Sequence, residues 1–305
     1  MSVSVYPNIS VTKIEPFIGE TPLFPLSRNK FDNVKIDAKL EWHQLGGSVK
    51  SRPAYRIIKD AIARGKLNDQ KQLVDATSGN TGIAYATILN RLGLGLTLFV
   101  PDNASEERKK IFKALGVDIR YTSGYESTEG AREAAKELVR QYPDKYFYAD
   151  QYDNPSNWKA HYDSTANEIW RQTEGKITHF VAGLGTTGTF TGTGRRLKEL
   201  NPEIELIALQ PETALHGLEG WKHLETADTP AIYDHRLADR TEIISTEESY
   251  ETMKTASRNE GLLLSPSSAA NLAGAKKIAA NLDRGHVVTV FPDDYSKYIS
   301  ETNIF

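Results

Sequence analysis

Short apolar runs alternate with longer amphipathic stretches along most of the chain. The apolar runs predict strands at 35–42, 72–76, 94–100, 117–121, 178–182, 204–209 and 287–291. The amphipathic stretches predict helices at 52–64, 81–92, 106–115, 128–141, 189–200, 246–260 and 267–282. Strands that are separated by helices need crossover connections, which favour parallel pairing. The pattern therefore predicts an α/β fold with two mostly parallel sheets flanked by helices.

The length of 305 residues suggests two domains, because chains of this size usually divide into domains with separate hydrophobic cores. Asp150–Asn157 is rich in turn residues and is a candidate boundary. Pro211–Ala238 is the least periodic region, and long connections of this kind are usually functional or mobile.

Composition narrows the classes of function. The formal net charge is −3, and no basic stretch is interleaved with aromatic residues, so no nucleic-acid partner is expected. The absence of cysteine excludes disulfides, thiolate nucleophiles and iron–sulfur clusters, and nothing calls for a metal site. Met1–Val5 lacks the pattern of a signal peptide, and no apolar run approaches the ~20 residues of a membrane span. We expect a cytoplasmic protein that does not bind membranes.

The first loop with candidate chemistry is Leu45-Gly46-Gly47-Ser48-Val49-Lys50, between a predicted strand and a predicted helix. Two glycines permit a tight turn, and Lys50 then falls at the helix start. The positive field of the helix N-terminus would lower the pKa of its ammonium and favour the neutral amine that attacks carbonyl groups. The alternative is an ordinary solvated lysine after a turn.

The second loop is Thr77-Ser78-Gly79-Asn80-Thr81-Gly82, again between a strand and a helix. Hydroxyls, an amide and unpaired backbone N–H groups converge there, which suits a bound carboxylate. The alternative is an elaborate helix cap, since Ser, Thr and Asn all cap helices.

The third loop is Gly183-Leu184-Gly185-Thr186-Thr187-Gly188-Thr189. Its glycines permit close backbone approach, and the following helix N-terminus and three threonine hydroxyls favour a phosphate group. The loop also matches the dinucleotide fingerprint G-x-G-x-x-G, with Glu212 near the expected acidic position. A nicotinamide oxidoreductase is therefore a serious alternative from this loop alone, but it leaves the other two loops unexplained.

Taken together, the three loops supply a reactive lysine, a cradle for a carboxylate and a cup for a phosphate. An enzyme that processes amino acids with pyridoxal 5'-phosphate needs all three. The combination predicts this cofactor more specifically than any single loop does.

At this point the sequence resembles the cysteine synthase family of fold-type II pyridoxal-phosphate enzymes, and most closely its B type. The resemblance runs nearly end to end. It is carried by Ile18–Leu23, Gly46–Lys50, Ala76–Gly82, Pro101–Arg108, Asp150–Asn157, Ile177–Phe180, Gly185–Gly188 and Tyr298–Ser300. It implies β-replacement on an O-activated serine, most simply O-acetylserine, by a sulfur nucleophile to give cysteine. It also implies a homodimer, a smaller mobile domain at 40–147 with the carboxylate loop, and a larger domain at 1–39 plus 148–305 with the phosphate loop.

The resemblance also implies residue roles. Lys50 would be joined covalently to the cofactor, and Asn80 would bind its ring oxygen. The phosphate would be bound by Gly185, Thr186, Thr187, Gly188 and Thr189. The substrate carboxylate would be held by Thr77, Ser78, Gly79, Thr81 and Gln151.

Ser267 matches the serine that faces the cofactor's pyridine nitrogen in this family. Because a serine does not keep that nitrogen protonated as an aspartate would, the ring is a weaker electron sink. Loss of a β-leaving group should then dominate over transamination or racemisation. The alternative is that Ser267 caps the helix that follows it.

The sequence departs from the family pattern at His43-Gln44-Leu45, at Ser51 after the lysine, and at Ala269. None of these changes removes a catalytic group, but they leave the second substrate open. Several related activities remain as alternatives: an O-phosphoserine sulfhydrylase, a cystathionine- or diaminopropionate-forming enzyme, a serine or threonine dehydratase, and a catalytically silent homologue.

The leaving group can be argued from His216–His223. Anchoring on Gly217 and Trp221 places Glu219 and Gly220 where the B type has two arginines. A phosphate leaving group needs a cationic clamp, and a glutamate would repel it. The sequence therefore predicts a preference for O-acetylserine over O-phosphoserine, unless Lys222 or His223 supplies the clamp. The alternative is that Glu219 is a solvated loop charge.

Overall fold

The structure is a computed structural model that describes residues 10–26 and 33–299. Met1–Val5 and Ser300, which enter the sequence analysis, lie outside the described residues. Within them, no helix is long and apolar enough to cross a membrane.

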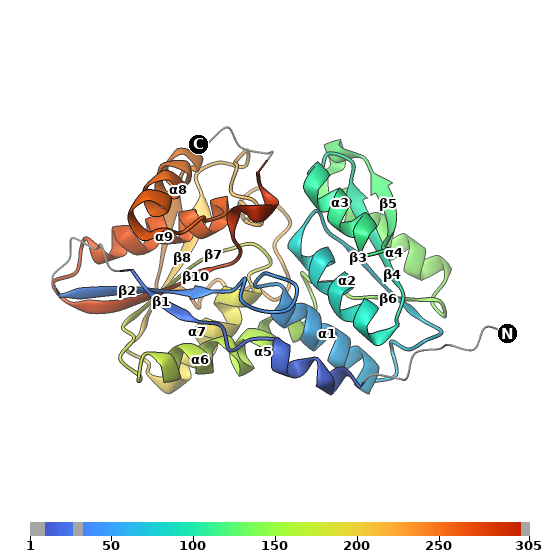
Figure 1. Ribbon diagram of the computed structural model, residues 1–305, viewed down its shortest axis with the longest axis horizontal. Coiled ribbons are helices and arrows are strands. Elements are labelled where there is room, and N and C mark those ends of the chain that lie inside the picture. The colour runs from blue at the N-terminus through green and yellow to red at the C-terminus, as the bar shows by residue number, and fades with distance from the viewer. Residues whose placement is uncertain (1–9, 27–32, 300–305) are drawn as a thin grey trace.

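Two sheets stand side by side (Figure 1). The larger has the order β1-β2-β10-β7-β8-β9, and only β1 is antiparallel to its neighbour. Its strands are β1 (Leu23–Pro25), β2 (Val34–Leu40), β7 (His179–Gly183), β8 (Glu205–Pro211), β9 (Arg240–Ile244) and β10 (Gly285–Phe291). The smaller sheet is parallel, in the order β5-β4-β3-β6. Its strands are β3 (Gln72–Ala76), β4 (Leu96–Pro101), β5 (Asp118–Thr122) and β6 (Tyr146–Tyr148).

Helices cover both faces of the larger sheet (Figure 1). On one side lie α5 (Ser156–Asp163), α6 (Thr165–Gln172) and α7 (Gly188–Leu200), and on the other α8 (Thr246–Glu260) and α9 (Pro266–Ala279). The smaller sheet packs with α2 (Asn80–Leu92), α3 (Glu106–Ala114) and α4 (Ser127–Gln141), while α1 (Ser51–Ala63) contacts both α2 and α5. Four short 3-10 helices complete the described elements: η1 (Val11–Lys13), η2 (Glu15–Phe17), η3 (Gly124–Glu126) and η4 (Tyr295–Lys297).

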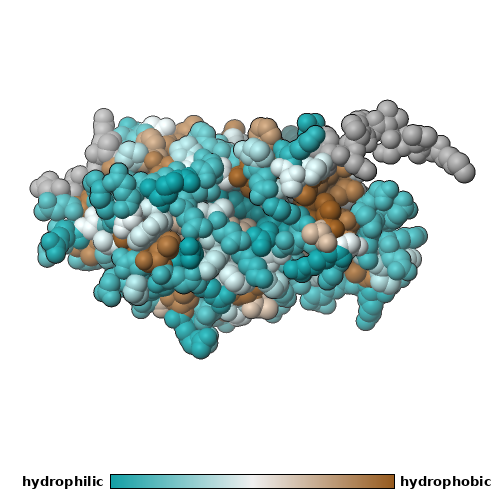
Figure 2. Space-filling model, turned by 90° about the horizontal axis from the view of Figure 1, so that it is seen from below, coloured by the Kyte–Doolittle hydropathy of each residue, from teal (hydrophilic) through white to brown (hydrophobic). Residues whose placement is uncertain are grey.

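Buried apolar residues explain why these segments form a layered fold. Strands β4 and β7 are buried along nearly their whole length, as parallel strands covered on both faces must be. Helix α9 is apolar or small on almost every side, because it lies between the larger sheet and α8. The face seen from below is mostly hydrophilic, with hydrophobic groups in limited areas (Figure 2).

The predicted fold class is confirmed, and most predicted elements are found within two or three residues. Strand 72–76 and helix 246–260 have the predicted bounds, whereas β2 ends at Leu40 rather than 42 and α9 ends at Ala279 rather than 282. The sequence analysis missed β1, β6, β9, α5 and α6. These are short elements: β1 and β6 have three residues each, and β9 is an edge strand with alternating burial.

The parallel topology fixes where chemistry can occur. The carboxyl ends of β3, β7 and β10 lead directly into Thr77, Leu184 and Pro292, at the edge of each sheet where ligands bind in open α/β folds. Residues 212–239, in the region predicted to be a long connection, contain no helix or strand.

Candidate active site

A cavity of about 110 Å³ lies where the three predicted loops meet. All but one of the predicted site residues line it: Lys50, Thr77, Ser78, Gly79, Asn80, Thr81, Gln151, Gly185, Thr186, Thr187, Thr189 and Ser267. The exception is Gly188, which begins α7 and packs against Asn157. Segments separated by more than 200 residues in the sequence thus converge on one small volume.

Lys50 stands at the N-cap of α1, after a turn in which Gly46 and Gly47 adopt positive φ. Val49 N–H donates to Pro292 C=O, which ties the turn to the end of β10. Burial lowers the pKa of the Lys50 ammonium, and the negative charge of Asp293 opposes this shift. Its Nζ makes no hydrogen bond to any described residue. An amine in this setting is suited to react with a carbonyl group, unlike a solvated surface lysine.

The carboxylate loop is not spent on capping α2. Gly79 is the N-cap of that helix and has no side chain that could cap it, although Thr77 Oγ1 accepts from Gly79 N–H at 3.1 Å. Thr81 Oγ1 instead donates to Gln151 Oε1 at 2.6 Å, and Gln151 Nε2 donates to Ala76 C=O at 3.0 Å. Gln151 is thereby held against the loop, as a residue that binds the same ligand would be.

Asp293 is a buried acid that the sequence analysis missed. It accepts hydrogen bonds from Asn80 Nδ2 and from the Tyr298 hydroxyl, both at 2.8 Å. Asn80 Oδ1 is buried without a partner among the described residues. A signal was available, because Asp293 follows a predicted buried strand at the edge where parallel sheets bind ligands.

The third loop has the geometry of an anion cup. Thr187 adopts φ +68° immediately before α7, a conformation that is uncommon for non-glycine residues and especially so for a β-branched one. A Cβ on Gly185 would lie 1.9 Å from Gly220 C=O, so the loop backbone packs directly on the segment 217–222. Thr187 Oγ1 is buried with no hydrogen-bond partner among the described residues. An unpaired hydroxyl at a helix N-terminus fits a phosphate group.

Ser267 lies inside α9 rather than at its cap. The helix is capped by Ser265, whose Oγ accepts from Ser268 N–H, so the alternative role of Ser267 as the cap is wrong. Its neighbour in the cavity wall, Asn271, accepts from Gly183 N–H and donates to Val290 C=O. These bonds join α9 to the ends of β7 and β10.

Two ion pairs connect the long connection to the smaller sheet's layer. Glu219 pairs with Arg108 of α3, and Ser78 Oγ lies 3.5 Å from the same carboxylate. Lys222 pairs with Glu129 of α4, so its ammonium is already engaged and is not available to clamp an anion. Glu219 is therefore not a solvated loop charge but part of the cavity wall.

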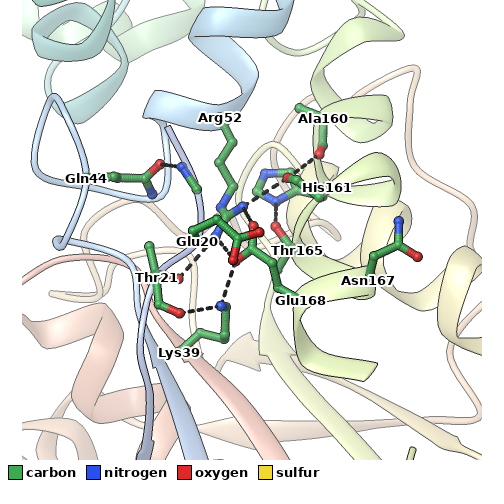
Figure 3. Close-up of polar contacts among 12 residues, drawn as sticks. Glu20, Thr21, Lys39, Gln44, Arg52, Ala160, His161, Thr165, Asn167 and Glu168 are labelled. Carbon is green, nitrogen blue, oxygen red and sulfur yellow. Dashed lines mark hydrogen bonds and ion pairs between the residues drawn. The ribbon is translucent and has the colours of Figure 1, made fainter. Parts of the chain in front are cut away.

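A buried ionic network surrounds Arg52 (Figure 3). Arg52, two positions after the lysine, donates to both Glu41 and Glu168, and Lys39 donates to Glu168 at 2.6 Å. Arg52 and Lys39 hold the pKa of the Glu168 carboxyl well below its usual range, despite the opposing effect of burial. Gln44, a departure from the family pattern, accepts from Gly19 N–H and donates to Glu41. The departure is thus accommodated by hydrogen bonds below the site.

The dinucleotide alternative fails on geometry. Glu212 is exposed and does not line the cavity, although β7, α7 and β8 do form the expected strand–helix–strand unit. Within the described residues, no group of three or more His, Asp or Glu is placed to hold a metal ion.

Comparison with known proteins agrees with this geometry. Residues 14–293 match the family model described as "Pyridoxal-phosphate dependent enzyme". The chain is 46% identical to the cysteine synthase of Aquifex aeolicus, over 93% of this chain and 89% of that protein. It is 37% identical to cysteine synthase B of Escherichia coli, over 97% and 96% of the two chains. The solved O-acetylserine-dependent cystathionine β-synthase of Helicobacter pylori superposes with a TM-score of 0.89, at 33% identity and full coverage of both chains.

The fold, the cavity and the family model define a fold-type II pyridoxal-phosphate enzyme. Within that class, the chain belongs to the cysteine synthase family. Both the cofactor and the family inferred from the sequence are confirmed.

Proposed function

We propose that the protein makes cysteine by pyridoxal-phosphate-dependent β-replacement on O-acetylserine, with sulfide or another sulfur compound as the nucleophile. The observation that carries the proposal is the convergence of Lys50, the carboxylate loop and the anion cup on one cavity. Its membership of the cysteine synthase family supports the same reaction.

The cavity residues fit the cofactor. The loop Gly185–Thr189 would hold the phosphate, Lys50 would carry the cofactor, and Asn80 would meet its ring oxygen. Ser267, which also lines the cavity, would face the ring nitrogen. The unpaired buried oxygens of Asn80 and Thr187 are the groups that such a ligand would satisfy.

When bound, the cofactor supplies an electron sink for the bonds at the substrate's Cα. With the cofactor bound, the neutral amine of Lys50 would remove the Cα proton of the substrate, and the Cβ–O bond to acetate would break. Burial favours that neutral form. The substrate carboxylate would be held by Thr77, Ser78, Gly79, Thr81 and Gln151, in the same cavity as Lys50. A sulfur nucleophile would then take the place of the departed acetate at Cβ, and Lys50 would return the proton to Cα.

We propose further that residues 40–147 move as the smaller domain and close over the substrate, with residues 1–39 and 148–305 as the larger one. The pairs Arg108–Glu219 and Lys222–Glu129 support this, because each joins the two parts, and the first does so in the cavity wall. Closure would exclude water, which otherwise competes with the sulfur nucleophile. The family resemblance supports a homodimer located in the cytoplasm. Sedimentation of the purified protein would test the oligomeric state.

A second candidate is formation of cystathionine, in which homocysteine replaces the inorganic sulfur donor. It is favoured by the close structural likeness to the Helicobacter pylori enzyme. Both candidates share the first half of the reaction and differ only in the nucleophile that enters the cavity.

The deciding experiment is a panel of donors and nucleophiles. The purified protein should be yellow and lose its colour with borohydride. O-acetylserine, O-phosphoserine and serine would each be combined with sulfide, thiosulfate and homocysteine, and the products separated by chromatography. Cysteine from O-acetylserine at the highest rate is expected. Keto acid and ammonia in every mixture would instead identify a dehydratase, and the absence of any product would identify a silent homologue.

A further inference from the structure

Two buried polar residues on α5 face the anion cup, and neither belongs to the binding roles described above. Asn157 and His161 are four positions apart, so they lie on the same side of the helix, which packs closely on α7. Each is only 1% exposed. Polar side chains buried to this degree are costly unless they make hydrogen bonds, so their partners show what they are for.

Asn157 joins the two ligand-binding loops through one amide group. Its Nδ2 donates to Gln151 C=O at 2.6 Å and to Thr186 Oγ1 at 3.1 Å. Thr186 Oγ1 also lies 3.4 Å from Gly188 N–H, which donates to it. A hydroxyl has two acceptor positions and one proton. Since both acceptor positions are taken, the Thr186 proton is available to a third partner in the cavity that the residue lines.

His161 acts on the other end of the cup. Its Nδ1 lies 2.9 Å from Thr165 Oγ1 and its Nε2 lies 3.3 Å from Thr189 Oγ1 (Figure 3 shows the contact with Thr165). Burial, followed by the positive charges of Arg52 and Lys50, holds the pKa of His161 well below its usual range. A neutral imidazole has one donor and one acceptor, so it can receive the Thr165 proton and donate to Thr189. Thr189 would then keep its own proton for the anion.

We infer that Asn157 is a positioning residue that orients the Thr186 hydroxyl for the cofactor phosphate and transmits its occupancy to Gln151 at the carboxylate site. His161 supports the same cup through Thr189. The inference rests on the proposed function, because it takes the anion to be the cofactor phosphate. The close contact of α5 and α7 supports it: a Cβ on Gly188 would lie 2.0 Å from Asn157 Oδ1.

The test uses Asn157→Leu, which keeps the volume but removes both donated hydrogen bonds. Apoprotein would be titrated with pyridoxal phosphate, and the reconstituted protein with an unreactive amino acid, following the cofactor's absorption. We expect each affinity to fall about three- to tenfold, the range of a single hydrogen bond. Lys159→Met, on another side of the same helix, is the matched control and should change neither.

A double-mutant cycle with Thr186→Val separates positioning from general loosening of the fold. If Asn157 acts through Thr186, the double variant should bind the cofactor about as well as Thr186→Val alone. The phosphorus NMR signal of the bound cofactor should shift in Asn157→Leu. Asn157→Asp, which keeps the size but replaces the donors by a carboxylate that also adds negative charge beside the cup, covers the case that the leucine variant does not fold.

The outcomes distinguish failure of the proposed function from failure of the role inferred for Asn157. Wild-type apoprotein that takes up no pyridoxal phosphate would overturn the proposed function and this inference together. Normal uptake by wild type, with unchanged affinities in Asn157→Leu and Asn157→Asp, would overturn the inference alone. Independent, multiplying effects of Asn157→Leu and Thr186→Val would do the same.

Discussion

Among single residues, Lys50 has a chemical role but contributes little to the stability of the fold. Its Nζ makes no hydrogen bond to a described residue, and burial already disfavours its charged form. Lys50→Ala should therefore abolish β-replacement and the borohydride-sensitive colour, while the free energy of unfolding changes little. Activity assays and urea unfolding of the apoprotein would measure the two effects. Turnover by Lys50→Ala without an added amine would end the case for this lysine.

Asp75 is a buried acid just before the carboxylate loop, and its titration should appear in stability. Burial raises its pKa from 3.8 to about 7, and Asp150 adds to the shift, while the N–H groups of Ala76 and Gln151 oppose it. Tyr85 and Tyr148, whose own pKa values are raised by burial, face the same carboxyl. The folded protein thus keeps a proton on Asp75 that the unfolded chain releases at lower pH.

The sign of the effect follows from linkage. Between pH 3.8 and about 7, folding takes up a proton at Asp75, so this residue's contribution to stability falls as the pH rises. The fall is about 1.4 kcal/mol per pH unit at most. Asp75→Asn cannot titrate and should gain on the wild type as the pH rises through that window. Urea unfolding of both proteins across it would show this, and a pH-independent difference would refute it.

At the scale of elements, the buried network of Arg52 joins α1, α6 and β2 beneath the site. Arg52→Met would leave Glu41 and Glu168 buried without their main cation, a loss of about 3–5 kcal/mol. Arg56→Met is the matched control, because Arg56 lies on the same helix in a partly exposed ion pair worth about 1 kcal/mol or less. Thermal unfolding of the two variants would compare them. Equal losses would show that burial of the network carries no special weight.

The helices and strands differ in how well the sequence predicts them. Long periodic helices such as α8 and buried strands such as β3 could be predicted, because their hydrophobic pattern is contained in their own sequence. Helices α5 and α6 could not, because their eight residues each are mostly polar or aromatic and are stabilised by packing on α1 and α7. The loss matters functionally, since α5 carries Asn157 and His161.

The site was more predictable than its support. Loops rich in Gly, Ser and Thr can be recognised from the local sequence, and ten of their predicted residues line one cavity, together with Gln151 and Ser267. Asp293 and Arg108 escaped the analysis of the site because their places depend on contacts across the chain: Asp293 binds Asn80, and Arg108 binds Glu219. No local pattern records such a pairing.

At the scale of the whole molecule, the cavity is closed by charges of opposite sign from its two sides. Arg108 is almost fully buried, its guanidinium lies 4.8 Å from the centre of the Tyr298 ring, and Glu219 meets it from the long connection. Glu219 thus offsets the positive charge beside Ser78. The cavity presents no net cation at this point to a substrate's leaving group.

This arrangement predicts the choice of leaving group and a way to change it. Wild type should prefer O-acetylserine, because a phosphate group brings nearly two negative charges towards the Glu219 carboxylate. Glu219→Gln keeps the shape but removes the charge, so Arg108 can serve a phosphate, and the ratio of kcat/KM for O-phosphoserine over O-acetylserine should rise about tenfold or more. Glu225→Gln, an exposed glutamate of the same connection that does not line the cavity, is the control. Wild type that uses both donors equally well, or an unchanged ratio in Glu219→Gln, would show that Glu219 does not set the specificity.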